Sequence, residues 1–174
     1  MSKMIIAISF VALMATGAWG LSRTAAPAQA VFHGVGPAGF RIEGKTPTLI
    51  LKEDAKIFTV VVGLKQLTTG IAVRDKHMRD KYLEVEKFPE ATLEVAREGL
   101  DGSGALIKSK GKLTLHGKTA ELPFEYRATC KAELCDVAGT VAIHMPDFGI
   151  VIPVYLGVTM KPDITVDVAF QVHK

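Results

Sequence analysis

The chain has 174 residues, of which 48% are hydrophobic and 22% charged, and its formal net charge at pH 7 is +3. That charge is too small for the dense positive field that nucleic-acid binding usually requires. The length suits one domain with a sizeable core, so we expect a single folded unit and no nucleic-acid partner.

The first thirty residues have the layout of a secretory signal peptide. One lysine precedes a short apolar run, and small residues follow it. Cleavage fits after Gly20 or after Ala30, and we favour Ala30 because residues 21–30 have no strand or helix pattern. An uncleaved anchor is the alternative, although the uncharged run is shorter than the ~20 residues of a spanning helix. We therefore expect residues 1–30 to be cleaved and residues 31–174 to work in the periplasm or outside the cell.

The remaining chain consists mostly of short segments with apolar residues at alternate positions. Residues 31–39 contain three glycines and one proline, so we expect an irregular edge there, whose pairing with a second copy could produce dimers. The expected strands are residues 40–43, 48–52, 57–62, 91–96, 105–115, 122–128, 137–145 and 164–172. About eight antiparallel strands with one wet and one dry face form either a barrel or a sandwich.

Two small residues favour the barrel. Ser109 and Gly111 stand between Ile107 and Leu113 on the inward face of one strand, where a sandwich would need large residues for native packing density. Eight strands is also the size at which a barrel can enclose one small ligand. We predict an all-β, about eight-stranded antiparallel barrel with a central cavity.

Two hairpin turns are also expected. Gly117-Lys118 can form a tight turn, because glycine adopts the positive φ that such a turn needs. Cys130 and Cys135 enclose four residues, and in an exported protein this spacing is more typical of a disulfide at a hairpin tip than of a metal site. A redox-active pair usually has closer spacing and a helix N-terminus, and the sequence shows neither.

A short helical insertion near residues 70–83 interrupts the strand pattern. Met78 and Tyr82 are four residues apart, as are Asp75 and Arg79, so a helix would carry an apolar pair beside an ion pair. The proline of Phe88-Pro89 ends any helix. We expect Met78 and Tyr82 to form an apolar lid over the mouth of the barrel.

A long apolar ligand would need a dry tube, because each buried CH₂ contributes about 0.8 kcal/mol. Each candidate liner alone could simply pack in the core, but as a set they indicate a cavity. They are Phe40, Leu67, Ile71, Met78, Tyr82, Phe88, Leu113, Phe124, Tyr126, Ile143, Phe148 and Ile150. Arg74 suits a phosphate or other polar headgroup at the rim, beside an exposed pair formed by Asp75 and Arg79. The five histidines share no spacing typical of zinc ligands, so we expect no metal and no cofactor.

Several blocks of the sequence resemble the YceI-like family and together cover most of residues 40–172. They are Leu67-Thr68-Thr69-Gly70, Arg74-Asp75-Lys76-His77-Met78, Tyr82-Leu83, Phe88-Pro89-Glu90-Ala91-Thr92-Leu93, residues 111–118 and Asp147-Phe148-Gly149-Ile150. The family comprises periplasmic or secreted lipocalin-like barrels that hold polyisoprenoid or quinone chains in an apolar interior. The resemblance therefore implies a lipid-carrying barrel. The glycine-rich first strand and the Cys130/Cys135 pair depart from the family pattern.

These observations predict an exported, non-enzymatic carrier of a polyprenyl or quinone lipid, with a membrane protein as a candidate delivery partner. Two alternatives stay open. An enzyme would use Arg74, Asp75 and His77 for acid–base work, and all three would point inward with His77 near a carboxylate. A protein-binding or stress-response module would instead have a filled barrel and an exposed edge or apolar patch.

Overall fold

One antiparallel sheet contains most of the secondary structure of the computed structural model, which describes residues 22–23, 28–54, 56–96, 102–155 and 157–173. The strands of this sheet are β1 (Ser22–Arg23), β2 (Gln29–Val35), β3 (Arg41–Thr46), β4 (Leu49–Glu53), β5 (Ile57–Gly63), β6 (Glu90–Ala96), β7 (Ile107–Leu115), β8 (Lys118–Lys131), β9 (Leu134–His144) and β12 (Asp163–His173). The other elements are η1 (Pro37–Gly39), α1 (Ala72–His77), η2 (Met78–Tyr82), η3 (Met145–Phe148), β10 (Val154–Tyr155) and β11 (Val158–Thr159).

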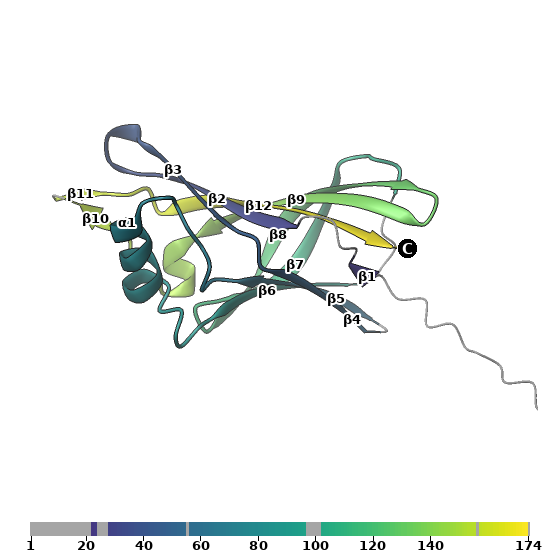
Figure 1. Ribbon diagram of the computed structural model, residues 1–174, viewed down its shortest axis with the longest axis horizontal. Coiled ribbons are helices and arrows are strands. Elements are labelled where there is room, and N and C mark those ends of the chain that lie inside the picture. Colours follow the sequence, from purple (N-terminus) through teal and green to yellow (C-terminus); the bar gives the residue numbers. More distant parts are fainter. Residues whose placement is uncertain (1–21, 24–27, 55, 97–101, 156, 174) are drawn as a thin grey trace, which may run out of the picture.

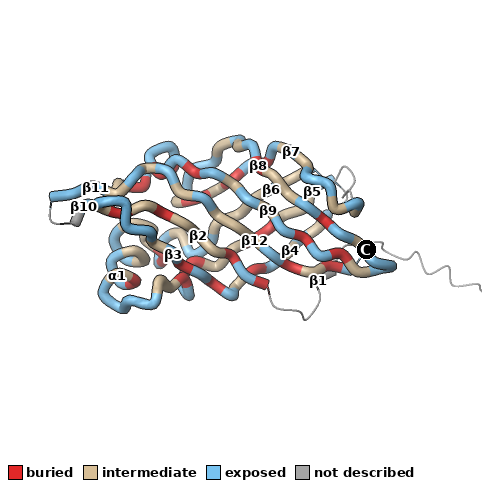
Figure 2. Tube along the Cα trace, turned by 90° about the horizontal axis from the view of Figure 1, so that it is seen from above, coloured by how far each residue is buried: buried red, intermediate tan, exposed pale blue. Residues whose placement is uncertain are grey.

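The sheet curls into a nearly closed barrel (Figures 1 and 2). Its strand order is β3-β2-β12-β9-β8-β7-β6-β5-β4, and β1 pairs with β12. Only Pro47 and Thr48 separate β3 from β4, so these strands are two halves of one bent path that pairs first with β2 and then with β5. Thr46 Oγ1 donates a 2.9 Å hydrogen bond to the carbonyl of Gly63 and fixes the bend. The predicted antiparallel barrel is confirmed, with nine strands along the path.

The segment expected to be an irregular edge is instead a regular strand. Gln29–Val35 forms β2, which pairs with β12 on one side and with β3 on the other. Glycine in β3 makes this possible, because a Cβ on Gly44 would lie only 2.1 Å from the ring of Phe32. Only the short turn Pro37–Gly39 is irregular. Because both sides of β2 are occupied, this segment is not the edge strand that was expected, and the dimer stays a prediction.

The β7–β8 hairpin turns one residue earlier than predicted. Leu115 pairs with Lys118, so the two turn residues are His116 and Gly117. Their φ angles are 51° and 75°, which is the pattern of a type I′ turn. The sequence did not indicate His116 because non-glycine residues seldom adopt positive φ.

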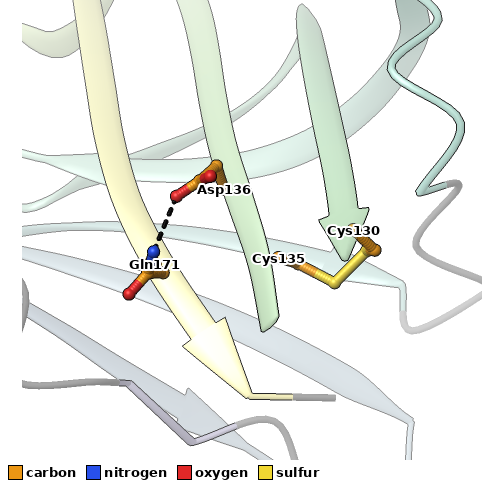
Figure 3. Close-up of a disulfide and its surroundings, with 4 residues drawn as sticks. All are labelled: Cys130, Cys135, Asp136 and Gln171. Atoms are coloured by element: carbon orange, nitrogen blue, oxygen red, sulfur yellow. Dashed lines mark hydrogen bonds between the residues drawn. A yellow bond between two sulfur atoms is a disulfide. The ribbon is translucent and has the colours of Figure 1, made fainter. Parts of the chain in front are cut away.

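The hairpin-tip disulfide is confirmed. Cys130 and Cys135 are a cross-strand pair of β8 and β9 and are joined by a disulfide (Figure 3). Beside it, Gln171 Nε2 of β12 donates a 2.9 Å hydrogen bond to Asp136 Oδ1 of β9 (Figure 3). This tip lies at the opposite end of the barrel from α1 (Figure 1).

The predicted helical insertion is present as α1 and η2. After six α-helical residues the chain continues into a wider turn, in which the amide of Leu83 donates to the carbonyl of Met78 at 2.9 Å. Such π-type turns occur often at functional sites. Among the described residues, no helix combines the length and apolar character needed to cross a membrane.

Candidate binding cavity

The barrel contains a cavity of about 880 Å³. This volume lies toward the upper end of the range typical of ligand pockets, which is about 300–1,000 Å³. Its wall is mostly apolar and includes members of both packed core clusters, such as Leu113 and Ile143 of one and Val137 and Phe170 of the other. No aspartate or glutamate is among the described residues that line it.

The structure places ten of the twelve candidate liners on the cavity wall. They are Phe40, Leu67, Ile71, Met78, Tyr82, Leu113, Phe124, Tyr126, Ile143 and Ile150. Phe124 and Tyr126, which alternate along β8, stack with their ring centroids 6.0 Å apart. That these residues hold a ligand stays a prediction.

Phe88 and Phe148 do not line the cavity, so their placement there was wrong. The Phe88 ring packs against His116 with centroids 4.7 Å apart, and a Cβ on Gly117 would come within 2.7 Å of it. Phe148 is fully buried, and its carbonyl oxygen lies 3.2 Å from His116 Nδ1. His116 Nε2 is also 3.0 Å from a carboxylate oxygen of Glu84. Both phenylalanines therefore hold the β7–β8 turn against neighbouring loops.

The small residues of β7 play two different roles. Ser109 lines the cavity, as expected. Gly111 does not, because a Cβ there would lie 2.9 Å from both the Glu94 carbonyl oxygen and a methyl group of Leu93. Gly111 thus permits close approach of β6, and only half of the predicted gap opens into the cavity.

The Arg, His and Lys side chains among the described lining residues all belong to the helical insertion. Arg74, His77 and Lys81 line the cavity at the end covered by α1 and η2. Arg74 is held in place by the preceding loop, since its Nε donates to Thr69 Oγ1 at 2.7 Å and its Nη2 donates to the Thr69 carbonyl at 3.0 Å. One end of a mostly apolar cavity therefore carries cations.

Asp75 is not a rim charge, contrary to prediction. It is only 5% exposed and accepts hydrogen bonds from the hydroxyls of Thr68 and Thr69 and from the Thr69 amide, the last at 2.7 Å. Burial raises the pKa of this carboxyl, but these hydrogen bonds and the nearby charge of Arg79 outweigh it, so the pKa lies below the usual value.

The expected Asp75–Arg79 ion pair is also not formed. Arg79 Nη1 instead lies 3.4 Å from the carbonyl oxygens of Lys65 and Leu67. Their spacing along a helix indicated that Asp75 and Arg79 share one face. Residues 65–69 pack against that face, however, and form hydrogen bonds with both side chains in place of the ion pair. Asp75 and Arg79 thus anchor the helical insertion to residues 65–69.

Met78 and Tyr82 lie on the cavity wall and are both half-buried in the π-type turn. Lys81 Nζ sits 5.5 Å from the centroid of the Tyr82 ring, close enough for a cation–π contact. This placement is the one required of a lid, although lid function itself stays a prediction.

No group of three or more described His, Cys, Asp or Glu residues could hold a metal ion. His77 forms no hydrogen bond or ion pair with a carboxylate in the described part of the chain. Asp75 is turned toward Thr68 and Thr69 and is not part of the cavity wall. The inward-pointing triad of Arg74, Asp75 and His77 that an acid–base enzyme would need is therefore not assembled.

Sequence comparison decides the family. The profile of the YceI-like domain matches residues 28–172. The chain belongs to the YceI-like domain family. A UPF0312 protein of Yersinia pestis is 39% identical over 71 residues, which are 40% of this chain and 36% of that protein. A UPF0312 protein of Vibrio cholerae is 31% identical over 103 residues, covering 55% of this chain and 54% of its own length. The matched stretches thus span about half or less of these relatives.

Solved structures share the fold of this YceI-like chain. A polyisoprenoid-binding domain from Saccharophagus degradans, implicated in plant cell wall breakdown, superposes with a TM-score of 0.70 at 18% identity, over 88% of this chain and 96% of that one. BcnA of Burkholderia cenocepacia has a TM-score of 0.68 at 13% identity, over 84% and 96% of the two chains. At these identities the likeness establishes the fold alone.

Sequence reasoning missed part of the wall. The apolar residues that alternate along residues 164–172 were not named as candidate liners, yet Ile164, Val166, Val168, Phe170 and Val172 of β12 all line the cavity. The same reasoning applied to β2 would have found Phe32, had residues 31–39 been read as a strand. Val154 begins the two-residue strand β10 and Met160 follows the equally short β11, where no periodicity indicates which way a side chain points.

Proposed function

We propose that this YceI-like protein is an exported, non-enzymatic carrier that binds an isoprenoid-type lipid, a polyprenyl or quinone chain, non-covalently in the barrel cavity. The observation that carries the proposal is the cavity of about 880 Å³ with an apolar wall and cationic groups at one end only. The likeness to a polyisoprenoid-binding domain supports the same class of ligand.

The lining determines how such a lipid would lie. Each methylene group buried against the apolar wall contributes about 0.8 kcal/mol, so the hydrocarbon chain would fill the interior. The polar head would remain at the mouth, near Arg74, His77 and Lys81. Arg74 Nη1 has no hydrogen-bond partner among the described residues, so it can donate to a phosphate or a quinone carbonyl.

The two alternative functions have less support. The acid–base enzyme lacks its carboxylate, because Asp75 is occupied by Thr68 and Thr69. The protein-binding module with a filled barrel conflicts with the size of the cavity. Carrier function is favoured because it alone uses the apolar interior.

Export is part of the proposal. The segment expected to be the signal peptide, residues 1–30, lies mostly outside the described residues. Within it, however, Ser22–Arg23 pairs with β12, Ala28 is buried, and the buried Ala30 belongs to β2. We therefore place the cleavage after Gly20, since cleavage after Ala30 would remove residues that belong to the barrel.

The direct test is extraction and mass spectrometry of lipid bound to protein purified from its native host. We expect an isoprenoid lipid at close to one molecule per barrel. Ser109→Phe, which puts a ring into the cavity, should reduce that amount severalfold without loss of the β-sheet spectrum. Lys110→Phe adds the same ring on the exposed outer face of β7 and should leave the lipid content unchanged. Wild-type protein without lipid, or equal retention in Ser109→Phe, would contradict the proposal.

A further inference from the structure

We propose that the mouth of the barrel docks onto an anionic lipid bilayer through a rim of exposed apolar side chains. The apolar rim consists of Phe40, Ile71, Val73, Val151, Val154 and Val158. This inference concerns the outer surface of the mouth and stands whatever cargo the cavity holds.

The rim gathers most of the exposed large apolar side chains of the described structure. Six of the nine belong to it, and Val151, Val73 and Phe40 are 71%, 68% and 60% exposed. Single exposed apolar residues are ordinary, but a cluster at one end marks an interaction site. Ile50, Ile57 and Leu106 are the other three.

Three separate segments build the rim at the same end of the barrel. Figure 1 shows the β2–β3 turn, α1 and the β10–β11 hairpin projecting together from the end opposite the carboxyl terminus. Phe40, Ile71, Val73 and Val154 also line the cavity, so the exposed cluster surrounds its opening. Residues 150–160, which lead into and form the β10–β11 hairpin, contain no charged residue at all.

The charges around the rim identify the partner as an anionic surface. Segments 36–45, 70–82 and 150–163 contain seven Lys or Arg residues and four Asp or Glu residues, one of which is the buried Asp75. Arg41, Lys81 and Lys161 form no ion pair with any described residue. Apolar side chains beside unpaired cations are the combination that binds the interface of a membrane rich in anionic lipid.

A second copy of the chain is a poorer occupant for this surface. Two rims facing each other would bring their excess positive charge together, whereas an anionic bilayer neutralises it. Docking of this kind would place the cavity opening directly against the source of an apolar cargo, which then need not cross water.

Sedimentation with vesicles tests the proposal. Purified protein should pellet with vesicles of phosphatidylcholine mixed with phosphatidylglycerol and much less with vesicles of phosphatidylcholine alone. High salt should reduce binding to the mixed vesicles, because it screens the charges. Val151→Asp combined with Val158→Asp should reduce the bound fraction at least about tenfold. Neither residue lines the cavity, so these substitutions leave its wall unchanged.

Matched variants complete the experiment. Ile50→Asp combined with Leu106→Asp changes two apolar residues that are 44% and 45% exposed but lie away from the mouth, and it should leave vesicle binding unchanged. Arg41→Glu with Lys161→Glu should weaken binding at least about tenfold, as expected from roughly fivefold per charge at a membrane surface. The proposal would be overturned if the wild-type protein bound neither vesicle type or bound both equally. It would also be overturned if the rim were buried in a dimer that the valine variant dissociates.

Discussion

Asp75 shows how one buried carboxylate organises the mouth of the barrel. It is nearly inaccessible, and every hydrogen bond it accepts comes from Thr68 or Thr69. The Arg74 guanidinium donates hydrogen bonds to the hydroxyl and to the carbonyl oxygen of the same Thr69. The threonine loop and α1 are thus fixed relative to each other by polar contacts.

Replacing this carboxylate should destabilise the protein in a pH-dependent way. Asp75→Asn should lower the free energy of unfolding near neutral pH by about 1–3 kcal/mol, because buried donors lose a charged acceptor. The folded-state pKa is depressed, so this contribution is complete above the unfolded pKa, near 4, and is lost as the pH falls through the lower folded value. Urea unfolding from neutral pH down to about pH 3 should show the two proteins converging below about pH 4.

The exposed Asp80 provides the control, since its carboxylate forms an ion pair with the exposed Lys76. Asp80→Asn should change stability little, because exposed ion pairs contribute little. Equal stability of Asp75→Asn and wild type at neutral pH would show that the threonine contacts do not hold the mouth.

At the scale of elements, the helical insertion is short and depends on its surroundings. The helix α1 has six residues and no side-chain N-cap, and isolated helices of this length are not stable in water. Asp75 and Arg79 attach it to residues 65–69, while Met78 and Tyr82 cover the cavity.

Charge placed on this lid should empty the cavity. Met78→Glu combined with Tyr82→Glu should reduce co-purified lipid at least tenfold, because two carboxylates would face an apolar chain. The far-ultraviolet spectrum should remain that of a β protein, since neither residue is in the barrel sheet.

Swapping the outward ion pair, by Lys76→Glu with Asp80→Lys, puts two substitutions on the same stretch without touching the wall of the cavity. That variant should retain its lipid. Unchanged lipid in the Met78/Tyr82 variant would mean that these residues do not seal the cavity.

Element by element, the sequence predicted what depends on local periodicity. Alternation identified β7, β8, β9 and β12, and the change of spacing identified α1. Alternation failed where a glycine is required by a residue far away in the sequence. Gly44 leaves space for the ring of Phe32, and Gly111 allows the backbone of β6 to approach closely. Neither contact is visible in a single strand, so β2 was mistaken for an edge and the gap in β7 was overestimated. Asp75 was misjudged for a similar reason, since its partners come from a loop and not from its own helix.

The whole molecule has two unlike ends. One end carries the helical insertion, the apolar rim and the cationic part of the cavity wall, and the other carries the disulfide and the end of β12 (Figures 1 and 3). Figure 2 shows the strands running obliquely between these ends. Ser22–Arg23 pairs with the last residues of β12, so the start of the described chain also belongs to the disulfide end.

The position at which the signal peptide is cleaved tests whether residues 21–30 belong to the barrel. Ala28 and Ala30 are 5% and 3% exposed, Gln29 pairs with Ala169, and Ala30 pairs with both Val168 and Thr46. A chain that began at Val31 would lose these contacts, at a cost of about 1 kcal/mol for each hydrogen bond removed. The proposed export therefore predicts an intact mass that corresponds to an amino terminus at Leu21.

Three recombinant versions, beginning at Leu21, Ala28 and Val31, separate the contributions of β1 and β2. We expect the Val31 version to unfold at a distinctly lower urea concentration than the Ala28 version, because it alone lacks the first part of β2. The difference between the Leu21 and Ala28 versions then measures the short β1–β12 pairing. An exported protein that begins at Val31 and is as stable as the longer versions would restore the cleavage site after Ala30 and would make β1 dispensable to the barrel.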